Sequence, residues 1–267
     1  MCRFHSIYRS EANADVQLVL RPGYIFRYSS PAEPSWKDLV FGFRHVELDS
    51  EEARAVNAPS DCTDIWAFLT YILNCSNYLQ WLMSLFRGYG GLIEKRKIFS
   101  LDELDSYDII INCTGLGSHE LVADHTLQPA RGQILLVKAS WASHFVMNVR
   151  DDREGVVYVL PRADSVALGG SMEKGNWSEV VDPATEDRIL KGCKKVIPSL
   201  SKAVVMDRWA GLRPLSDSVR LESCVGNRGN TVIHCYGHGG QGVMLSWGCV
   251  LDVGDIVLQS LNTCSKL

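Results

Sequence analysis

The stretch 232-VIHCYGHGGQGVMLSWG-248 decides how this sequence is interpreted. Four glycines fall between positions 237 and 242, after one apolar run and before another. Glycine turns of this kind let a backbone approach a nucleotide or a flavin closely. Dinucleotide-binding folds usually carry such a turn in their first strand-to-helix junction. This turn lies near the other end of the chain, so its position needs an explanation.

Two further glycine segments accompany the opening stretch: 112-NCTGLGS-118 and 209-WAGLRP-214. Each is expected to be a turn that follows a buried strand. A strand that ends in glycines exposes backbone N–H groups at its carboxyl end, where α/β folds bind ligands. Ordinary turns also need glycine. The three segments together favour a ligand site.

The bulk composition is that of a globular protein that acts on a small molecule. The chain has 267 residues, of which 46% are hydrophobic, and a formal net charge of -4. No basic run is present that could neutralise several phosphates, so a nucleic-acid partner is not expected. The nine cysteines form no Cys-x-x-Cys pair, which leaves zinc ligation unsupported and predicts no metal.

Targeting signals point to one compartment. The apolar run 65-IWAFLTYIL-73 is about half of a bilayer span, so it predicts a buried helix and no membrane span. The final residues are Ser265, Lys266 and Leu267. A tripeptide of this kind at a free carboxyl end is recognised by the peroxisomal import receptor. The alternative is a frayed polar tail.

The pattern of apolar residues predicts a mixed α/β fold, with antiparallel strands in the middle of the chain. The first 16 residues are expected to be an irregular lead-in. Helices are expected at 64–86, broken near 74–77, and at 183–197 and 243–262; strands are expected at 15–20, 23–28, 92–100, 107–112, 131–139, 155–163, 165–171, 207–216 and 231–237.

Arg213 and Tyr158 are the polar side chains most in need of a partner. Arg213 stands in an apolar segment, so it requires an anion. That anion is either one of the chain's own carboxylates, such as Asp217 or Glu222, or a substrate carboxylate held bidentately. Tyr158 lies in an apolar strand, where the residue alone favours a core tyrosine bonded to a backbone carbonyl.

Two other kinds of chemistry find less support. His234 and His238 flank Cys235, and without further ligands at metal spacing both histidines are interpreted as structural. The sequence has no Gly-x-Ser-x-Gly elbow, so hydrolase chemistry is not supported.

Seven segments in order make the chain resemble the D-amino-acid oxidases, a family that includes the D-aspartate oxidases. The resemblance covers about residues 17 to 267, and the opening stretch extends through Trp247, Gly248 and Cys249. The other segments are PSWKDLVFGFR (34–44), NYLQWL (77–82), INCTGLGS (111–118), RGQILLV (131–137), LGGSMEKGNWSE (168–179) and GLRP (211–214).

The resemblance implies an FAD-dependent enzyme with a Rossmann-like FAD-binding domain interleaved with an antiparallel-sheet substrate domain. FAD-binding parts would span about 60–130 and 205–264, and substrate-domain parts about 17–60 and 131–205. The residues that would contact FAD are Ile98, Cys113, Thr114, Gly115, Gly239, Gly240, Gln241, Gly242, Val243 and Met244.

The implied reaction is the oxidative deamination of a D-amino acid, with dioxygen as acceptor and hydrogen peroxide as product. Arg213 would clamp the substrate α-carboxylate, Tyr158 would donate a hydrogen bond to it, and the carbonyl of Gly240 would accept from the amine. A peroxisomal location suits a producer of peroxide. A homodimer is a further expected assembly.

The sequence departs from the family in three places. The family opens with a strand, a Gly-x-Gly-x-x-Gly turn and a helix, which this chain lacks, so a catalytically silent truncated homologue is the alternative interpretation. Met172 stands where relatives that act on acidic substrates carry arginine, unless Arg150, Arg153 or Arg162 substitutes. Gln241 stands where neutral-substrate relatives have a tyrosine. We therefore expect substrates with neutral side chains, and substrates with acidic side chains are the alternative.

Overall fold

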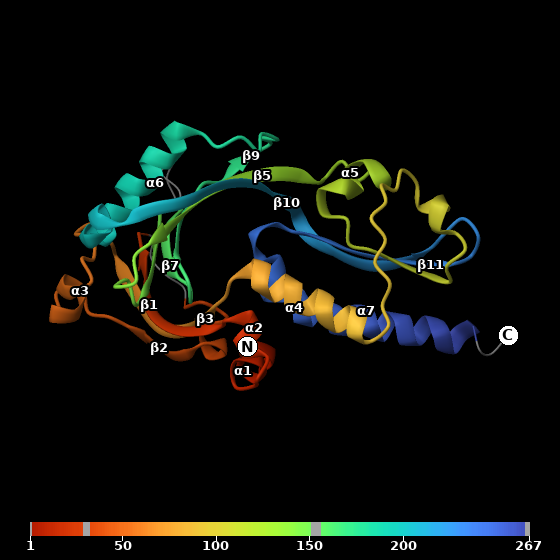
Figure 1. The fold of residues 1–267 in the computed structure, drawn as a ribbon, viewed down its shortest axis with the longest axis horizontal. Helices are drawn as coiled ribbons and strands as arrows, with labels where there is room; N and C mark the ends of the chain where they lie inside the picture. The colour runs from red at the N-terminus through yellow and green to blue at the C-terminus, as the bar shows by residue number, and fades with distance from the viewer. Residues whose placement is uncertain (1, 29–32, 151–155, 265–267) are drawn as a thin grey trace. The chain divides into compact units, whose positions relative to one another are not determined.

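A computed structural model describes residues 2–28, 33–150 and 156–264 (Figure 1). The tripeptide Ser265 to Leu267 and Arg153 lie outside these residues. The chain forms two compact units. Unit 1 comprises Met1–Leu92, Gly132–Met172 and Glu179–Gly211, and unit 2 comprises Ile93–Arg131, Glu173–Ser178 and Leu212–Leu267. Residues 60–92, which were expected in the FAD-binding part, belong to unit 1, and the assignment of segments to FAD binding stays a prediction.

Unit 1 is built on a mostly antiparallel sheet with the strand order β2-β3-β1-β6-β7-β8-β5, in which only β1 and β6 pair in parallel among the described strands. The strands are β1 (Val19–Arg27), β2 (Phe41–His45), β3 (Asp64–Ile72), β5 (Gln128–Lys138), β6 (Phe145–Val149), β7 (Val156–Pro161) and β8 (Val166–Gly169). The helices are α1 (Cys2–Tyr8), α2 (Asn13–Val16), α3 (Glu51–Ala55), α4 (Cys75–Gly88) and α6 (Pro183–Val196), with short 3-10 turns η1 (Lys37–Leu39) and η4 (Pro198–Lys202).

The predicted helix over 64–86 is half wrong. Its first half is the strand β3, and only the second half is helical, as α4. The strand buries both of its faces: Ile65 and Ala67 belong to one core cluster, and Trp66 and Phe68 belong to another. A strand covered on both faces has a continuous apolar run, which periodicity cannot separate from a buried helix.

The two strands expected at 15–20 and 23–28 are one strand, β1, which continues through Pro22 and Gly23. The parallel partner β6 pairs with β1 from Gly23 to Arg27, so Pro22, which has no amide hydrogen, lies just outside that register. A Cβ at Gly23 would lie 2.3 Å from the ring of Phe145. Glycine is therefore required by the close approach of the two strands, and it does not mark a turn.

The expected irregular lead-in is also wrong, because residues 2–16 contain α1 and α2. Ile7, Val16 and Leu18 form a buried cluster with Tyr78 of α4. The lead-in therefore covers one side of unit 1 with apolar side chains.

The helix predicted at 183–197 is confirmed as α6, which packs on β7 and β8. Asp182 caps it by accepting hydrogen bonds from the backbone N–H groups of Ala184 (3.3 Å) and Thr185 (2.9 Å). Pro183 occupies the first turn, where its missing N–H costs nothing.

Unit 2 contains the strand order β10-β11-β4, and β9 pairs with the start of β5 at Ala130 and Arg131. Its strands are β4 (Ile109–Asn112), β9 (Glu173–Lys174), β10 (Val204–Val225, which begins in unit 1) and β11 (Thr231–His238). Its helices are α5 (Ser118–Leu121) and α7 (Gly242–Cys264), with 3-10 turns η2 (Leu101–Leu104), η3 (Gly115–Gly117) and η5 (Gly239–Gln241).

Two expectations for unit 2 were wrong. The strand predicted at 92–100 is absent, since residues 91–100 have no regular structure. The segment WAGLRP is not a turn but lies inside the continuous strand β10, which confirms the strand expected at 207–216. The strands at 107–112 and 231–237 and the closing helix are confirmed as β4, β11 and α7.

One helical stretch of the described chain, Gly239–Asn262, is long and apolar enough to cross a bilayer. Its mean hydropathy is 1.3, and 6% of the apolar window is buried. Length and composition are weak evidence, because a core helix of a soluble protein passes the same test. The expectation of no membrane span stays a prediction.

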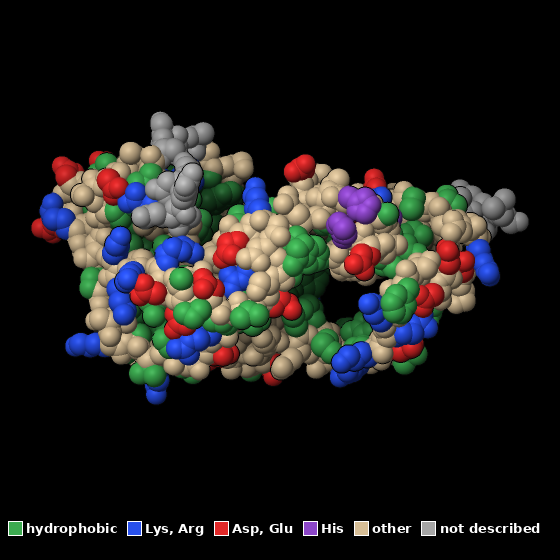
Figure 2. Space-filling view, turned by 90° about the horizontal axis from the view of Figure 1, so that it is seen from above, with side chains coloured by type: hydrophobic (Ala, Val, Ile, Leu, Met, Phe, Trp, Pro, Cys, Tyr) green, Lys and Arg blue, Asp and Glu red, His purple; other side chains and the backbone are tan. Residues whose placement is uncertain are grey.

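Charged side chains of both signs are interspersed on the face of the molecule shown in Figure 2. This distribution differs from the single-sign basic stripe by which proteins neutralise a nucleic-acid backbone. It agrees with the net charge of -4.

Candidate functional site

The two glycine turns of unit 2 lie at the same edge of a parallel strand pair. Strands β4 and β11 pair in parallel, with Asn112 opposite His234. Each strand runs at its carboxyl end into a glycine turn, η3 after β4 and η5 after β11. The carboxyl edge of parallel strands is where α/β folds bind ligands, so this edge is the candidate site.

Strand β10 brings Arg213 and Pro214 to the same edge. It pairs antiparallel with β11, with Leu215 opposite His238. A Cβ at Gly115 would lie 3.7 Å from Pro214, and a Cβ at Gly240 would lie 3.4 Å from Cδ of Arg213. The three glycine segments singled out in the sequence therefore do meet, although the middle one is a strand.

The backbone of both turns needs glycine. Gly115 has φ +55° and Gly239 has φ +56°, a left-handed conformation that costs other residues about 1 kcal/mol or more. Helix α7 begins directly after η5, so its unpaired N–H groups lie at this edge. The turns therefore present backbone donors with little side-chain cover.

The remaining predicted cofactor contacts are spread over unit 2. Ile98 is half-buried in the irregular segment, whereas Cys113 and Thr114 are exposed after β4. Gln241, Val243 and Met244 are exposed at the start of α7, where Met244 has 67% of its surface exposed.

A buried side chain that the sequence analysis missed, Asn112, fixes the first turn. Its Oδ1 accepts hydrogen bonds from the N–H (3.1 Å) and the hydroxyl (2.8 Å) of Thr114, so its amide nitrogen faces Ser118 and His234. His234 Nδ1 must then accept from that amide, at 3.2 Å. Burial lowers the pKa of His234, which favours the neutral imidazole. The signal in the sequence is an Asn two positions before a Thr in a glycine turn.

His234 is thus structural, as expected, and a second network supports the same strands. The hydroxyl of Tyr236 donates to Asp124 (2.8 Å), and Arg220 donates to that hydroxyl (2.6 Å). Hydrogen bonds from Thr126, Tyr236 and Arg220 lower the pKa of Asp124 to about 2. Glu222, one of the carboxylates considered for Arg213, instead bonds Arg220 at 2.6 Å.

Tyr158 lies in unit 1, half-buried on β7. Its ring rests on the Gly169-Gly170 pair: a Cβ at Gly169 would lie 2.1 Å from Cζ of Tyr158, and one at Gly170 would lie 2.6 Å from Cε1. The diglycine therefore leaves the space that the tyrosine ring occupies.

Of the three arginines considered for an acidic substrate, the two that the structure describes have partners within unit 1. Arg150 bonds Asp61 at 2.7 Å, and Arg162 bonds the hydroxyl of Ser165. Met172 has 60% of its surface exposed.

Comparisons with known proteins identify the family. A family model described as FAD dependent oxidoreductase (DAO) matches residues 6–253. The chain is 38% identical over 239 residues to a D-amino-acid oxidase of Rubrobacter xylanophilus, covering 89% of this chain and 71% of that protein. It is 35% identical over 263 residues to a D-aspartate oxidase of Homo sapiens, covering 96% of this chain and 74% of that protein.

The fold agrees with this assignment. A glycine oxidase structure from Geobacillus kaustophilus matches with a TM-score of 0.75, at 14% identity, over 96% of this chain and 77% of that chain. A match at such low identity shows the fold alone, whereas the family model and the sequence relatives show descent. The chain belongs to the FAD-dependent oxidoreductase family that contains the D-amino-acid oxidases and D-aspartate oxidases, and its cofactor is FAD.

Proposed function

We propose that this enzyme deaminates D-amino acids oxidatively, giving a 2-oxo acid, ammonia and hydrogen peroxide. The relatives named D-amino-acid oxidase and D-aspartate oxidase support the substrate class. The observation that carries the proposal is the position of Arg213. This guanidinium lies beside Gly240, at the edge of unit 2 where two glycine turns leave backbone groups exposed.

The glycine turns fit a flavin, because each is a place where a side chain is lacking and the backbone is accessible. The segment Cys113 to Gly115 and the turn from Gly239 to Met244 would hold the cofactor, with Ile98 beside it. When bound, FAD accepts a hydride from the substrate α-carbon and passes the electrons to dioxygen. The N–H groups at the start of α7 suit the negative charge that this transfer creates.

The protein's own part in the reaction is to bind and orient the substrate. Arg213 presents a planar fork that matches a carboxylate. Tyr158 would donate a hydrogen bond to the same carboxylate, and the carbonyl oxygen of Gly240 would accept one from the neutral amine. No strong base is required, so orientation supplies most of the rate enhancement.

Neutral side chains are the preferred substrates in this proposal. An acidic substrate needs a cation for its second carboxylate. Met172 offers none, and the guanidinium groups of Arg150 and Arg162 bond Asp61 and Ser165. D-Aspartate is therefore expected to react more slowly than a neutral D-amino acid of similar size.

The cellular address is part of the proposal. The peroxisomal import receptor would bind Ser265, Lys266 and Leu267. Other proteins of the peroxisome would then consume the hydrogen peroxide. A fluorescent fusion that keeps these residues at its free carboxyl end should enter peroxisomes, and a fusion that lacks them should not. Equal distribution of the two fusions would reject the address. A homodimer is likewise a prediction, to be checked by light scattering.

The activity is tested on the purified full chain. Flavin absorbance and peroxide release are measured with a panel of D- and L-amino acids. We expect flavin absorbance, and peroxide with neutral D-amino acids. A chain with no flavin and no peroxide would overturn the proposal and leave a catalytically silent binding protein.

The role of Arg213 has its own variants. Arg213→Leu should lower kcat/KM by about 100-fold or more, because it removes a charge-assisted bond to the carboxylate. Arg213→Lys keeps the charge but loses the fork, and should recover part of the activity. The matched control is Arg228→Leu in the same unit, whose side chain is 76% exposed and pairs with Asp105. Unchanged turnover in Arg213→Leu would reject the clamp.

A further inference from the structure

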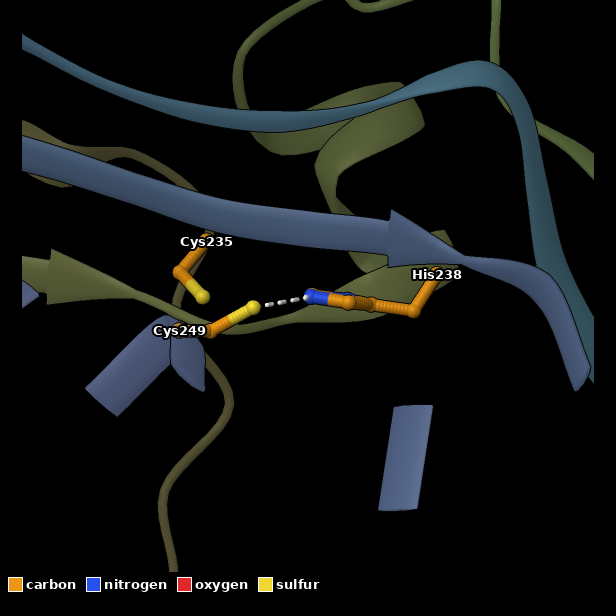
Figure 3. Close-up of side chains that lie close together, drawn as sticks. All are labelled: Cys235, His238 and Cys249. Atoms are coloured by element: carbon orange, nitrogen blue, oxygen red, sulfur yellow. Dashed lines mark hydrogen bonds between the residues drawn. The ribbon is translucent and has the colours of Figure 1, made fainter. Parts of the chain in front are cut away.

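Three side chains of unit 2 that the proposed reaction does not use point toward one another (Figure 3). They are Cys235 on β11, His238 at the end of β11 and Cys249 on α7. Their two sulfur atoms and the imidazole nitrogen all lie within 4.8 Å of one another. His238 Nε2 is 3.3 Å from Cys249 Sγ. All three residues are half-buried.

The local chain path explains why residues 14 positions apart meet. From Cys235 to His238 the strand advances about 10 Å, at roughly 3.3 Å per residue. After the turn at η5, the helix from Gly242 to Cys249 advances about 10 Å, at roughly 1.5 Å per residue. Because α7 packs back along β11, these two distances bring Cys249 level with Cys235.

The cluster joins two separate elements of unit 2. Cys235 and His238 belong to β11 and Cys249 belongs to α7, so a bound cation would connect the strand to the helix.

We propose that Cys235, His238 and Cys249 bind a thiophilic divalent cation such as Zn²⁺, with a water molecule at the fourth coordination position. Thiolate and imidazole ligands select zinc over hard cations such as Mg²⁺. A tetrahedral zinc with Zn–S bonds of about 2.3 Å places its ligand atoms roughly 3.5–3.8 Å apart. The atoms of this cluster need to move by less than about 1.5 Å to reach those separations.

The cation would fasten α7 to the sheet at the turn that carries Gly239 and Gly240. Thiolates must replace thiols on binding, so the site takes up metal with release of protons. The inference is independent of the proposed reaction, because metal content is measured whether or not the chain turns over a substrate.

The test is the metal content of the full chain, produced in zinc-supplemented medium and passed over a desalting column. Elemental analysis should give about one zinc per chain. Cys235→Ser and Cys249→Ser should each lower the bound zinc at least tenfold. The matched control is Cys75→Ser on α4 of unit 1, an exposed cysteine outside the cluster, which should keep the full content.

Titration of the wild-type chain with Cd²⁺ serves as a second measurement that needs no variant. The thiolate-to-cadmium absorption should saturate at one equivalent, with an intensity for two thiolates. No zinc together with no cadmium absorption would overturn the proposal. A Cys235–Cys249 disulfide found by mass spectrometry of the unreduced protein, or zinc that stays bound in both serine variants, would overturn it as well.

Discussion

Substituting Gly169 by alanine should displace Tyr158 and weaken substrate binding without unfolding unit 1. A Cβ at this position lies 2.1 Å from Cζ of Tyr158. Non-bonded carbon atoms rest at about 3.6 Å, so the ring must move by about 1.5 Å. Tyr158 is half-buried, so we expect its ring to move toward solvent, at a stability cost of about 1–2 kcal/mol.

The catalytic effect should be larger. Misplacing a substrate-orienting group by about 1 Å costs up to roughly 100-fold in rate. We therefore expect kcat/KM of Gly169→Ala to fall about 10–100-fold, close to the loss expected for Tyr158→Phe. Peroxide release with a neutral D-amino acid measures the activity, and thermal unfolding measures the stability. Gly88→Ala is the control, because a Cβ there meets nothing within 4 Å.

A double-mutant cycle separates displacement of Tyr158 from other effects of the added methyl group. In a Tyr158→Ala background the methyl has no ring to displace, so Gly169→Ala should then change stability by less than about 0.5 kcal/mol. If Gly169→Ala alone keeps the wild-type kcat/KM, or if its stability cost is the same in both backgrounds, the reasoning is refuted.

Three further predictions concern stability. Asp182→Ala removes the cap of α6 and should lower the free energy of unfolding in urea by about 1 kcal/mol. Asp187→Ala, at an exposed ion pair of the same helix, should lower it by less than half of that. Equal losses for the two variants would argue against capping. Arg131 is 2% exposed and bonds Glu173 at 2.8 Å, so Glu173→Gln should cost about 2 kcal/mol by weakening the pairing of a buried charge, and a change below 0.5 kcal/mol would contradict this. Asp124 has a pKa of about 2, below its unfolded value, so its contribution to stability is complete above about pH 4 and is lost as the pH falls to 2. Unfolding at pH 5 and pH 2.5 should show a smaller drop for Asp124→Asn than for the wild type, and equal drops would exclude this carboxylate as a source of acid sensitivity.

The two glycine turns after β4 and β11 and the helix α6 could be predicted from the sequence because their signals are local. A strand followed by glycines at 231–242 and an amphipathic pattern at 183–197 each specify structure within a few residues. The meeting of Gly240 with Arg213 could be inferred only through the resemblance, since the register between β10 and β11 is a long-range property.

The failures also have physical causes. Strand β3 was mistaken for a helix because its two faces enter different core clusters, which removes the alternation of a half-buried strand. The segment 92–100 has apolar residues only at its two ends, around four charged ones, so it offers no alternating apolar face to a sheet, and its residues have no regular structure.

The thiol-imidazole cluster was missed for a different reason. The sequence contains Cys235-x-x-His238, a spacing that suits metal ligands, but a second pair is lacking. The third side chain, Cys249, comes from a helix whose return path depends on the turn at Gly239. A Cys-x-x-His followed by a cysteine about two turns into the next helix is the sequence pattern that corresponds to this cluster.

The division of the chain into interleaved segments has a consequence for its synthesis. Unit 1 is complete in sequence at Gly211, whereas unit 2 requires the last 56 residues, which include β11 and α7. On a ribosome, the residues of β4 would therefore emerge well before their partner strand β11 is synthesised. They would stay unpaired while unit 1 is already folding. A nascent chain halted near residue 240 should then protect the core of unit 1 from protease while residues 93–131 are still cleaved.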